Sequence, residues 1–86
     1  MKTLKMEDIE LKDVLVYKDE IFHSLKHDIE FNTYIVKDIK SASIICDIIK
    51  YKDPHANVRW TQIPLDYIEN YIKIKDIIEE YPQYFI

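Results

Sequence analysis

The chain contains no glycine among its 86 residues. Glycine takes positive φ at the lowest cost, so tight turns in this chain must use other residues or be avoided. Asparagine and aspartate tolerate the left-handed conformation best after glycine, because their short side chains bond the local backbone. The candidates are Asn32, Asn57, Asn70, Asp19, Asp28 and Asp53. The same absence excludes glycine-rich phosphate loops, and with them the common nucleotide-binding enzymes.

Length and composition predict one folded unit. A chain of 86 residues has room for a single small domain over 1–86, and 48% apolar residues are enough for a core. Ile, Lys, Asp and Tyr are abundant, a bias typical of AT-rich genomes such as those of many viruses and phages. Stability should be modest, because a chain of this size buries only about 60% of its unfolded surface.

The charge balance argues against a strongly basic nucleic-acid-binding surface. Twelve basic and sixteen acidic residues give a formal charge of −4, whereas domains that neutralise phosphates are more often basic. Lys-Asp pairs recur along the chain, so charges of both signs are mixed. A local basic patch on an acidic protein remains compatible with these numbers.

Cysteine content and hydropathy predict a cytoplasmic protein, or one in the host-cell interior if it is viral. Cys46 is the sole cysteine, so no intramolecular disulfide can form. Residues 1–10 alternate charged and apolar side chains, unlike a signal peptide. No segment approaches the roughly 20 apolar residues that cross a bilayer, so we expect no membrane contact.

Two segments are predicted to be strands. Residues 13–17 (DVLVY) are short, β-branched and apolar, and a turn is expected at 18–20. A helical interpretation competes, because Val14, Tyr17, Ile21 and Leu25 are spaced 3, 4 and 4. Residues 31–39 (FNTYIVKDI) form the clearer strand, since they contain several good β formers.

Two short helices are predicted in the middle of the chain. Ser41 is a suitable N-cap for a helix over 42–50, in which four isoleucines form one apolar face. Asp53 and Pro54 are suitable N-cap and N1 residues for a second helix over 54–60. The two helices would form a helix-turn-helix-like pair.

A third helix is predicted from Pro64 to Pro82. Its apolar residues are spaced 4, 3, 4 and 3, which predicts one face, either core or a dimer seam. The fold class is therefore predicted as α+β, with a short β-hairpin or two-stranded sheet and about three helices. The residues of the predicted seam are Tyr67, Tyr71, Ile74, Ile78 and Tyr81.

Residues that could carry chemistry have simpler explanations. His23 and His27 are one helical turn apart, but no second ligand pair accompanies them, and two surface histidines are the alternative. Cys46 lies among isoleucines, where a thiol behaves as a buried hydrophobe. Paired carboxylates at 79–80 are typical of a solvated surface. We predict no catalytic residue, no metal and no cofactor.

The Arg59-Trp60 pair is the most informative surface candidate. A lone Trp is either a core anchor or an interface hot spot, and Trp, Tyr and Arg are enriched at hot spots. We therefore add Trp60 to the predicted interface residues. The aromatic stripe of tyrosines is interpreted as core or dimer seam in preference to a base-stacking platform.

Residues 42–63 (ASIICDIIKYKDPHANVRWTQI) resemble part of the Bro-N domain, which is found in baculovirus repeated-ORF proteins and phage antirepressors. The resemblance covers about a quarter of the chain, and Lys50 and Ile44 depart from the usual Gly and Asp. It implies a DNA-binding role in viral or phage transcription regulation. The matching positions are Ala42, Ile45, Cys46, Asp47, Ile48, Ile49, Tyr51, Lys52, Asp53, Pro54, Val58 and Arg59.

Two functional hypotheses follow, with an enzyme a distant third. The first is a DNA-binding regulatory module, in which asparagine and arginine read bases and lysine neutralises phosphates. The second is a small, non-catalytic factor that docks on a host protein. A homodimer fits both. Convergence of the cations on one face would favour DNA, and scattering among carboxylates would favour a protein. The predicted nucleic-acid-binding residues are Lys50, Lys52, His55, Asn57 and Arg59.

Overall fold

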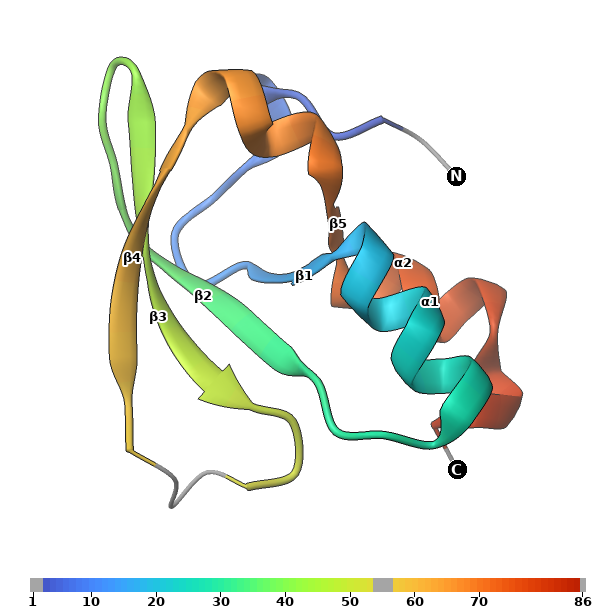
Figure 1. The fold of residues 1–86 in the computed structure, drawn as a ribbon. Coiled ribbons are helices and arrows are strands. Elements are labelled where there is room, and N and C mark those ends of the chain that lie inside the picture. The colour runs from blue at the N-terminus through green and yellow to red at the C-terminus, as the bar shows by residue number, and fades with distance from the viewer. Residues whose placement is uncertain (1–2, 54–56, 86) are drawn as a thin grey trace.

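The computed structural model describes residues 3–53 and 57–85. In this part of the chain, a five-stranded antiparallel sheet has the order β4-β3-β2-β1-β5 (Figure 1). The strands are β1 (Val14–Tyr17), β2 (Asn32–Ile39), β3 (Ser43–Lys50), β4 (Arg59–Pro64) and β5 (Tyr71–Lys73). The helices are α1 (Lys18–His27) and α2 (Ile74–Glu80), with 3-10 turns η1 (Met6–Asp8), η2 (Leu65–Asn70) and η3 (Pro82–Tyr84).

The predicted fold class is wrong, because the sheet has more than two strands and the helix-turn-helix-like pair is replaced by β3 and β4. The segment predicted as a helix over 42–50 is β3, which pairs with β2 on one side and β4 on the other. Four isoleucines in this segment are stiff at χ1 and favour a strand over a helix. Of the second predicted helix, 54–56 lie outside the described residues and β4 begins at Arg59.

The single helix predicted between Pro64 and Pro82 is also wrong. The structure divides this segment into η2, β5 and α2, and only Ile74–Glu80 is α-helical. Tyr71 to Lys73 pair with β1, so a tertiary contact interrupts the helical period. The seam residues Tyr67, Tyr71, Ile74, Ile78 and Tyr81 are consequently distributed over three elements and the residue after them.

The two strands predicted over 13–17 and 31–39 are confirmed as β1 and β2. The turn predicted at 18–20 is wrong, because α1 begins at Lys18 and runs to His27. Asp19 and Glu20 in its first turn and Lys26 and His27 in its last turn suit the helix dipole. The competing helical interpretation therefore holds for Ile21 and Leu25, though not for the residues of β1.

Two apolar clusters lie on opposite faces of the sheet. Neighbouring residues of a strand point to opposite faces, and the adjacent Leu15 and Val16 belong to different clusters. The first cluster contains Leu15, Val36, Ile44 and Cys46 and is covered by the N-terminal segment and η2. The second contains Val16, Phe31 and Ile72, together with residues of α1 and α2. Both helices therefore cover the β1–β5 end of one face, which Figure 1 shows at the right.

Three residues of the described chain have positive φ, and none is an asparagine: Lys12 at 73°, Asp28 at 53° and Lys52 at 65°. Asp28, one of the predicted positions, is the left-handed C-cap of α1. Lys12 and Lys52 were not predicted. A left-handed lysine costs about 1 kcal/mol or more, so two turns of this chain carry strain that glycine would avoid. Among the described residues, the helices are all too short or too polar to span a lipid bilayer.

Candidate interaction surface

A bare region of sheet lies at the β3–β4 end, on the face that α1 and α2 cover elsewhere. Ile35 is paired with Asp47, and Asp47 with Trp60. Directly paired residues share a face, so these three side chains form one row across β2, β3 and β4. Ile45, two residues before Asp47, lies on the same face. We call Ile35, Ile45, Asp47 and Trp60 the open face.

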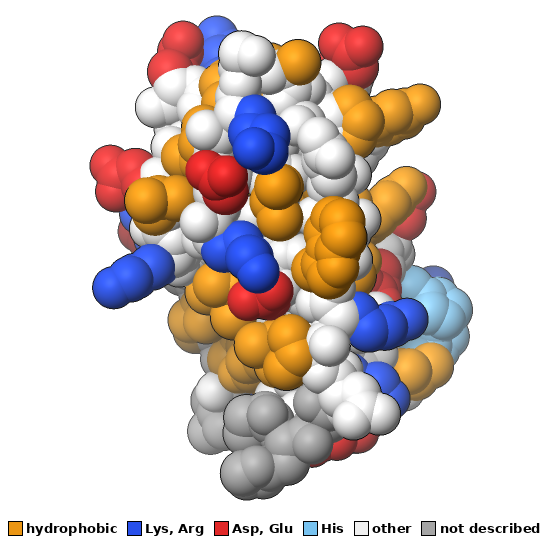
Figure 2. Space-filling model, turned by 90° about the vertical axis from the view of Figure 1, so that its left-hand side faces the viewer, with side chains coloured by type: hydrophobic (Ala, Val, Ile, Leu, Met, Phe, Trp, Pro, Cys, Tyr) orange, Lys and Arg blue, Asp and Glu red, His pale blue; other side chains and the backbone are white. Residues whose placement is uncertain are grey.

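Trp60 is the main exposed feature of the open face. Its side chain is 66% exposed, and Val58 close by in sequence is 55% exposed, whereas Ile35 and Ile45 are half-buried. Figure 2 views the side of the molecule on which β3 and β4 lie, and it shows apolar side chains interspersed with cations and carboxylates. An exposed Trp flanked by aliphatic side chains has the composition of a protein-binding hot spot.

The outer edge of β4 presents unused backbone groups. The Leu65 N–H donates to the Ala42 carbonyl at 3.0 Å, which continues the β3–β4 register. Bonded and non-bonded pairs alternate in an antiparallel ladder. Because Leu65 bonds to the residue just before β3, every second residue before it in β4 also directs its main-chain groups toward β3. The main-chain groups of the residues between them, Trp60 and Gln62, therefore point away from β3. In the described part of the chain, β3 is the single strand that pairs with β4.

Arg59 lies on the opposite face of β4 from Trp60, in a row with Ile48 and Tyr34. Burial, followed by the negative charge of Glu20, raises the pKa of Tyr34, and the positive charge of Arg59 offsets part of this rise. Tyr34 and Tyr17 pack edge-on against Tyr71, at 5.3 and 5.4 Å between ring centroids. This cluster is internal packing between β1, β2 and β5.

Of the predicted DNA-binding residues, Lys50 and Arg59 lie on the same face of the sheet, because Arg59 is paired with Ile48 and Lys50 lies two residues after Ile48 in β3. Lys50 Nζ lies 3.4 Å from the Glu30 carboxylate, and Lys52 Nζ lies 5.6 Å from the centre of the Tyr51 ring. Asn57 and Arg59 are exposed before and at the start of β4. His55 lies outside the described residues. Two further lysines near the hairpins pair with carboxylates: Lys37 with Asp47 and Lys40 with Asp38, each at 3.5 Å.

The predicted interface residues separate into exposed and packed groups. Trp60 and Tyr67 are exposed, and Ile78 is partly so. Ile74 and Tyr81 pack against the second cluster, and Tyr71 packs against the first. The packed residues contribute to the two apolar clusters, so Trp60 and Tyr67 are the predicted interface residues best placed to contact another molecule.

The open edge of β4 is not among the features predicted from the sequence. The signal was present, because four of the six residues over 58–63 (VRWTQI) are β-branched or aromatic, namely Val58, Trp60, Thr61 and Ile63. Asp53-Pro54 instead indicates a helix start. The adjacent Pro64 also fits an edge position, since proline has no N–H to offer a neighbouring strand.

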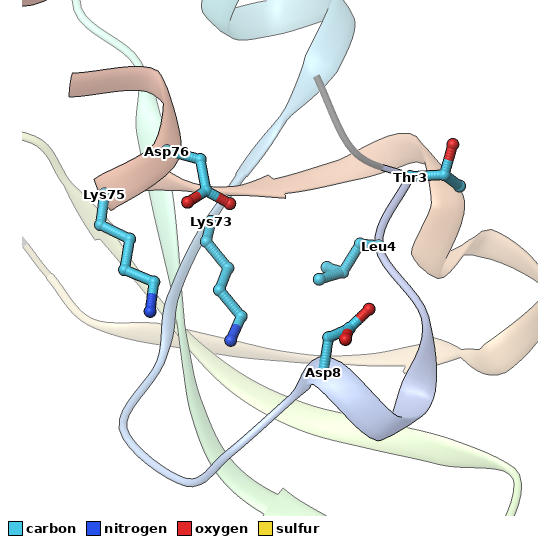
Figure 3. A pocket seen from close by; sticks show the side chains of 6 residues that line it. All are labelled: Thr3, Leu4, Asp8, Lys73, Lys75 and Asp76. Carbon is cyan, nitrogen blue, oxygen red and sulfur yellow. The ribbon is translucent and has the colours of Figure 1, made fainter. Parts of the chain in front are cut away.

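The hollow in Figure 3 is a weaker candidate. It has a volume of about 220 Å³ and is lined by Thr3, Leu4, Asp8, Lys73, Lys75 and Asp76. Small-molecule sites usually measure about 300 to 1,000 Å³. Lys73 extends beside Lys75 in the figure, but it is already paired with the Asp13 carboxylate at 3.1 Å. Two lysines and two aspartates leave no net charge to select an ion.

The single thiol is unsuited to nucleophilic chemistry. Cys46 is fully buried in the first cluster, and burial, followed by the nearby Asp47 charge, raises the pKa of its thiol to about 11. The reactive form of cysteine is the thiolate, which is scarce at neutral pH with such a pKa. Within 3–53 and 57–85, no three His, Cys, Asp or Glu side chains are grouped to hold a metal ion.

In comparisons with protein-family models, curated proteins and solved structures, this chain matches none. The resemblance of residues 42–63 to the Bro-N domain stays a prediction.

Proposed function

We propose that this protein is a non-catalytic protein-binding module, and that Trp60 on the open face anchors its partner. The observation that carries the proposal is the 66% exposure of the Trp60 side chain on a half-apolar sheet face that neither helix covers. Burying a Trp at an interface contributes more than burying most other side chains, because it combines large apolar area with little conformational freedom. The inert Cys46 thiol is consistent with a binding role.

The distribution of charge supports a protein partner over duplex DNA. Lys37, Lys40 and Lys50 each lie within 3.5 Å of a carboxylate oxygen. A phosphate would have to displace these carboxylates, and they would also repel it. A partner that presents mixed charges and an apolar centre fits this surface without that cost. We place such a module in the cytoplasm, or in the host-cell interior if the protein is viral.

The test is selection of binding peptides from a displayed library on the wild-type protein. Each selected peptide is then measured against Trp60→Ala and against Tyr84→Ala, a matched control because Tyr84 is 51% exposed and belongs to η3. We expect Trp60→Ala to weaken binding by about tenfold or more, and Tyr84→Ala to leave it unchanged. Peptides that bind Trp60→Ala as tightly as wild type, or the absence of any Trp60-dependent peptide, would contradict the proposal.

A DNA titration distinguishes the competing hypothesis. We expect little binding to duplex DNA at physiological salt. Binding that weakens steeply with salt and is lost in Arg59→Ala would instead support the DNA-binding module.

A further inference from the structure

We propose that two copies of this protein associate edge to edge through β4, which forms one continuous antiparallel sheet across the pair. The proposal goes beyond the open face, because it concerns backbone groups at the strand edge and a second copy of the chain. Trp60 and Gln62 direct their N–H and C=O groups away from β3, as the Leu65–Ala42 bond establishes. An exposed edge of this kind is a template for another strand.

The sequence of β4 is suited to antiparallel pairing with β4 of a second copy of the chain. In an antiparallel pair centred on Thr61, Trp60 lies opposite Gln62 of the second copy, and Gln62 lies opposite Trp60. All outward N–H and C=O groups of these residues then find partners within the Arg59–Pro64 strand. A pair centred on Gln62 would set Trp60 against Pro64, which lacks an N–H. A pair centred on Trp60 would require Val58, which precedes the strand.

Charge and side-chain pairing agree with the Thr61-centred arrangement. Arg59 is the single charged residue of β4, and it would lie opposite Ile63 of the second copy, four positions from the other Arg59. No like charges are opposed within the strand pair. The two Trp60 side chains become diagonal neighbours on the same face, within reach for large aromatic side chains. The pairing would therefore cover part of the exposed Trp60 side chain in each copy. It would also make the open faces of the two copies continuous.

Surface next to β4 is also complementary. A hollow of about 190 Å³ is lined by Thr61, Ile63, Pro64 and Tyr67, with residues of β1 and β5. Arg59 of the second copy would reach the face of Ile63, beside this hollow. Tyr67 is 59% exposed there, and a guanidinium over an aromatic ring is attracted to it. Arg59 has no carboxylate within salt-bridge distance in the described part of the chain that this contact would have to break.

The arrangement closes as a dimer. A two-fold pair uses both β4 edges, and the remaining edges are the β5 strands of three residues each, where α2 follows directly. Such short edges resist further strand addition. We therefore expect dimers and no fibres.

The experiment combines mass measurement with a register-specific cross-link. Residues directly opposite in a non-hydrogen-bonded pair have Cα atoms about 4.5 Å apart, within the range of a disulfide. Thr61→Cys should therefore form a disulfide-linked dimer on oxidation, whereas Arg59→Cys should not, because its copy lies four residues away. Cys46 is the direct cross-strand partner of Thr61 and lies within disulfide range of a cysteine at that position, so both variants are made in a Cys46→Ala background.

Gln62→Pro supplies the blocking variant. The Gln62 N–H is directed away from β3, so its loss should abolish dimers while the β-sheet circular dichroism persists. Gln62→Ala is the matched control, since both variants lose the Gln62 Nε2 bond to Ser43 Oγ at 2.6 Å. Wild-type protein with the mass of one chain at all concentrations, or equal cross-linking of Thr61→Cys and Arg59→Cys, would overturn the proposal. Trp60-dependent peptide binding by such a monomer would still stand, so the two proposals fail separately.

Discussion

The two edges of the sheet differ in how they are closed. β5 has three residues, and its Lys73 pairs at 3.1 Å with Asp13, where both side chains are only 13% and 18% exposed. The chain then turns directly into α2. β4 has six residues, its outer main-chain groups are unused by another described strand, and its Trp60 faces solvent. One edge is therefore closed by its own chain, and the other is left open.

The difference between the two edges reflects how unevenly the helices cover the sheet. α1 and α2 pack on the β1–β5 end, where the second cluster forms. The same face continues bare across β3 and β4. With 86 residues, the chain has too few elements to cover both faces everywhere, because small domains bury a limited part of their surface. The uncovered end is consequently where contact with other molecules is expected.

The largest difference in stability should come from truncating a core side chain at the β1–β5 end of the sheet, which we call the closed end, compared with truncating a side chain at the β3–β4 end, which we call the open end. Ile77 on α2 is fully buried in the second cluster, so Ile77→Ala should lower the free energy of unfolding by about 2 to 5 kcal/mol. Trp60→Ala at the open end should change it by less than about 1 kcal/mol. Urea denaturation followed by far-ultraviolet circular dichroism, at concentrations where wild type is a single chain, measures both. Equal losses would show that Trp60 belongs to the core.

A smaller effect is expected from alkaline titration at the closed edge. Burial, followed by Tyr34 and Tyr17, raises the pKa of Tyr71 to about 12. The folded state therefore retains the Tyr71 proton after the unfolded chain has lost it at about pH 10. The stability from this group is fully present below pH 10 and is lost as the pH rises to about 12.

Replacement of the tyrosine isolates this contribution. Tyr71→Phe should make the urea midpoint fall less between neutral pH and about pH 11 than in wild type. The control is Tyr67→Phe, because Tyr67 is exposed and packs against no other ring in the described chain. An identical pH dependence for Tyr71→Phe and wild type would contradict the assignment to Tyr71.

The smallest expected effect on stability comes from replacing two residues with positive φ, Asp28 and Lys52. Asp28 ends α1 at φ 53°, where its negative charge also opposes the helix dipole. Asp28→Gly should raise stability by about 0.5 to 1 kcal/mol. Lys52→Gly near the open end should gain less, because it removes the contact of Lys52 with the Tyr51 ring. Thermal melting compares them, and a larger gain for Lys52→Gly would reverse the prediction.

Local composition was sufficient to predict some elements and misleading for others. The β-branched and aromatic residues of β1 and β2 favour strands by themselves. In β3, Ile44, Ile45, Ile48 and Ile49 fit one helical face equally well. A strand that is paired on both sides and buried along much of its length has a nearly continuous apolar run instead of clear alternation. The period alone therefore could not separate the two structures.

The candidate site depends on pairing between distant segments. Trp60 was predicted as an interface residue from its type and its neighbour Arg59. Its position at an open edge follows from the strand order, in which β5 pairs with β1 and leaves β4 outermost. This order is a tertiary property that no local window of the sequence contains. The same β1–β5 pairing interrupted the helix predicted between Pro64 and Pro82.

The two clusters on opposite faces have a consequence for how β1 finds its alignment. A half-buried strand resists a one-residue slip, because the slip would turn its apolar residues to solvent. Leu15 and Val16 are both fully buried, so a slip of β1 would merely exchange two aliphatic side chains between two apolar environments. Hydrophobic burial therefore discriminates poorly between the alignments. The alignment of β1 must therefore be set by the polar contacts of Asp13. Its carbonyl accepts the Val36 N–H at 2.9 Å, and its carboxylate pairs with Lys73. These contacts determine which residues of β1 face the first cluster and which face the second.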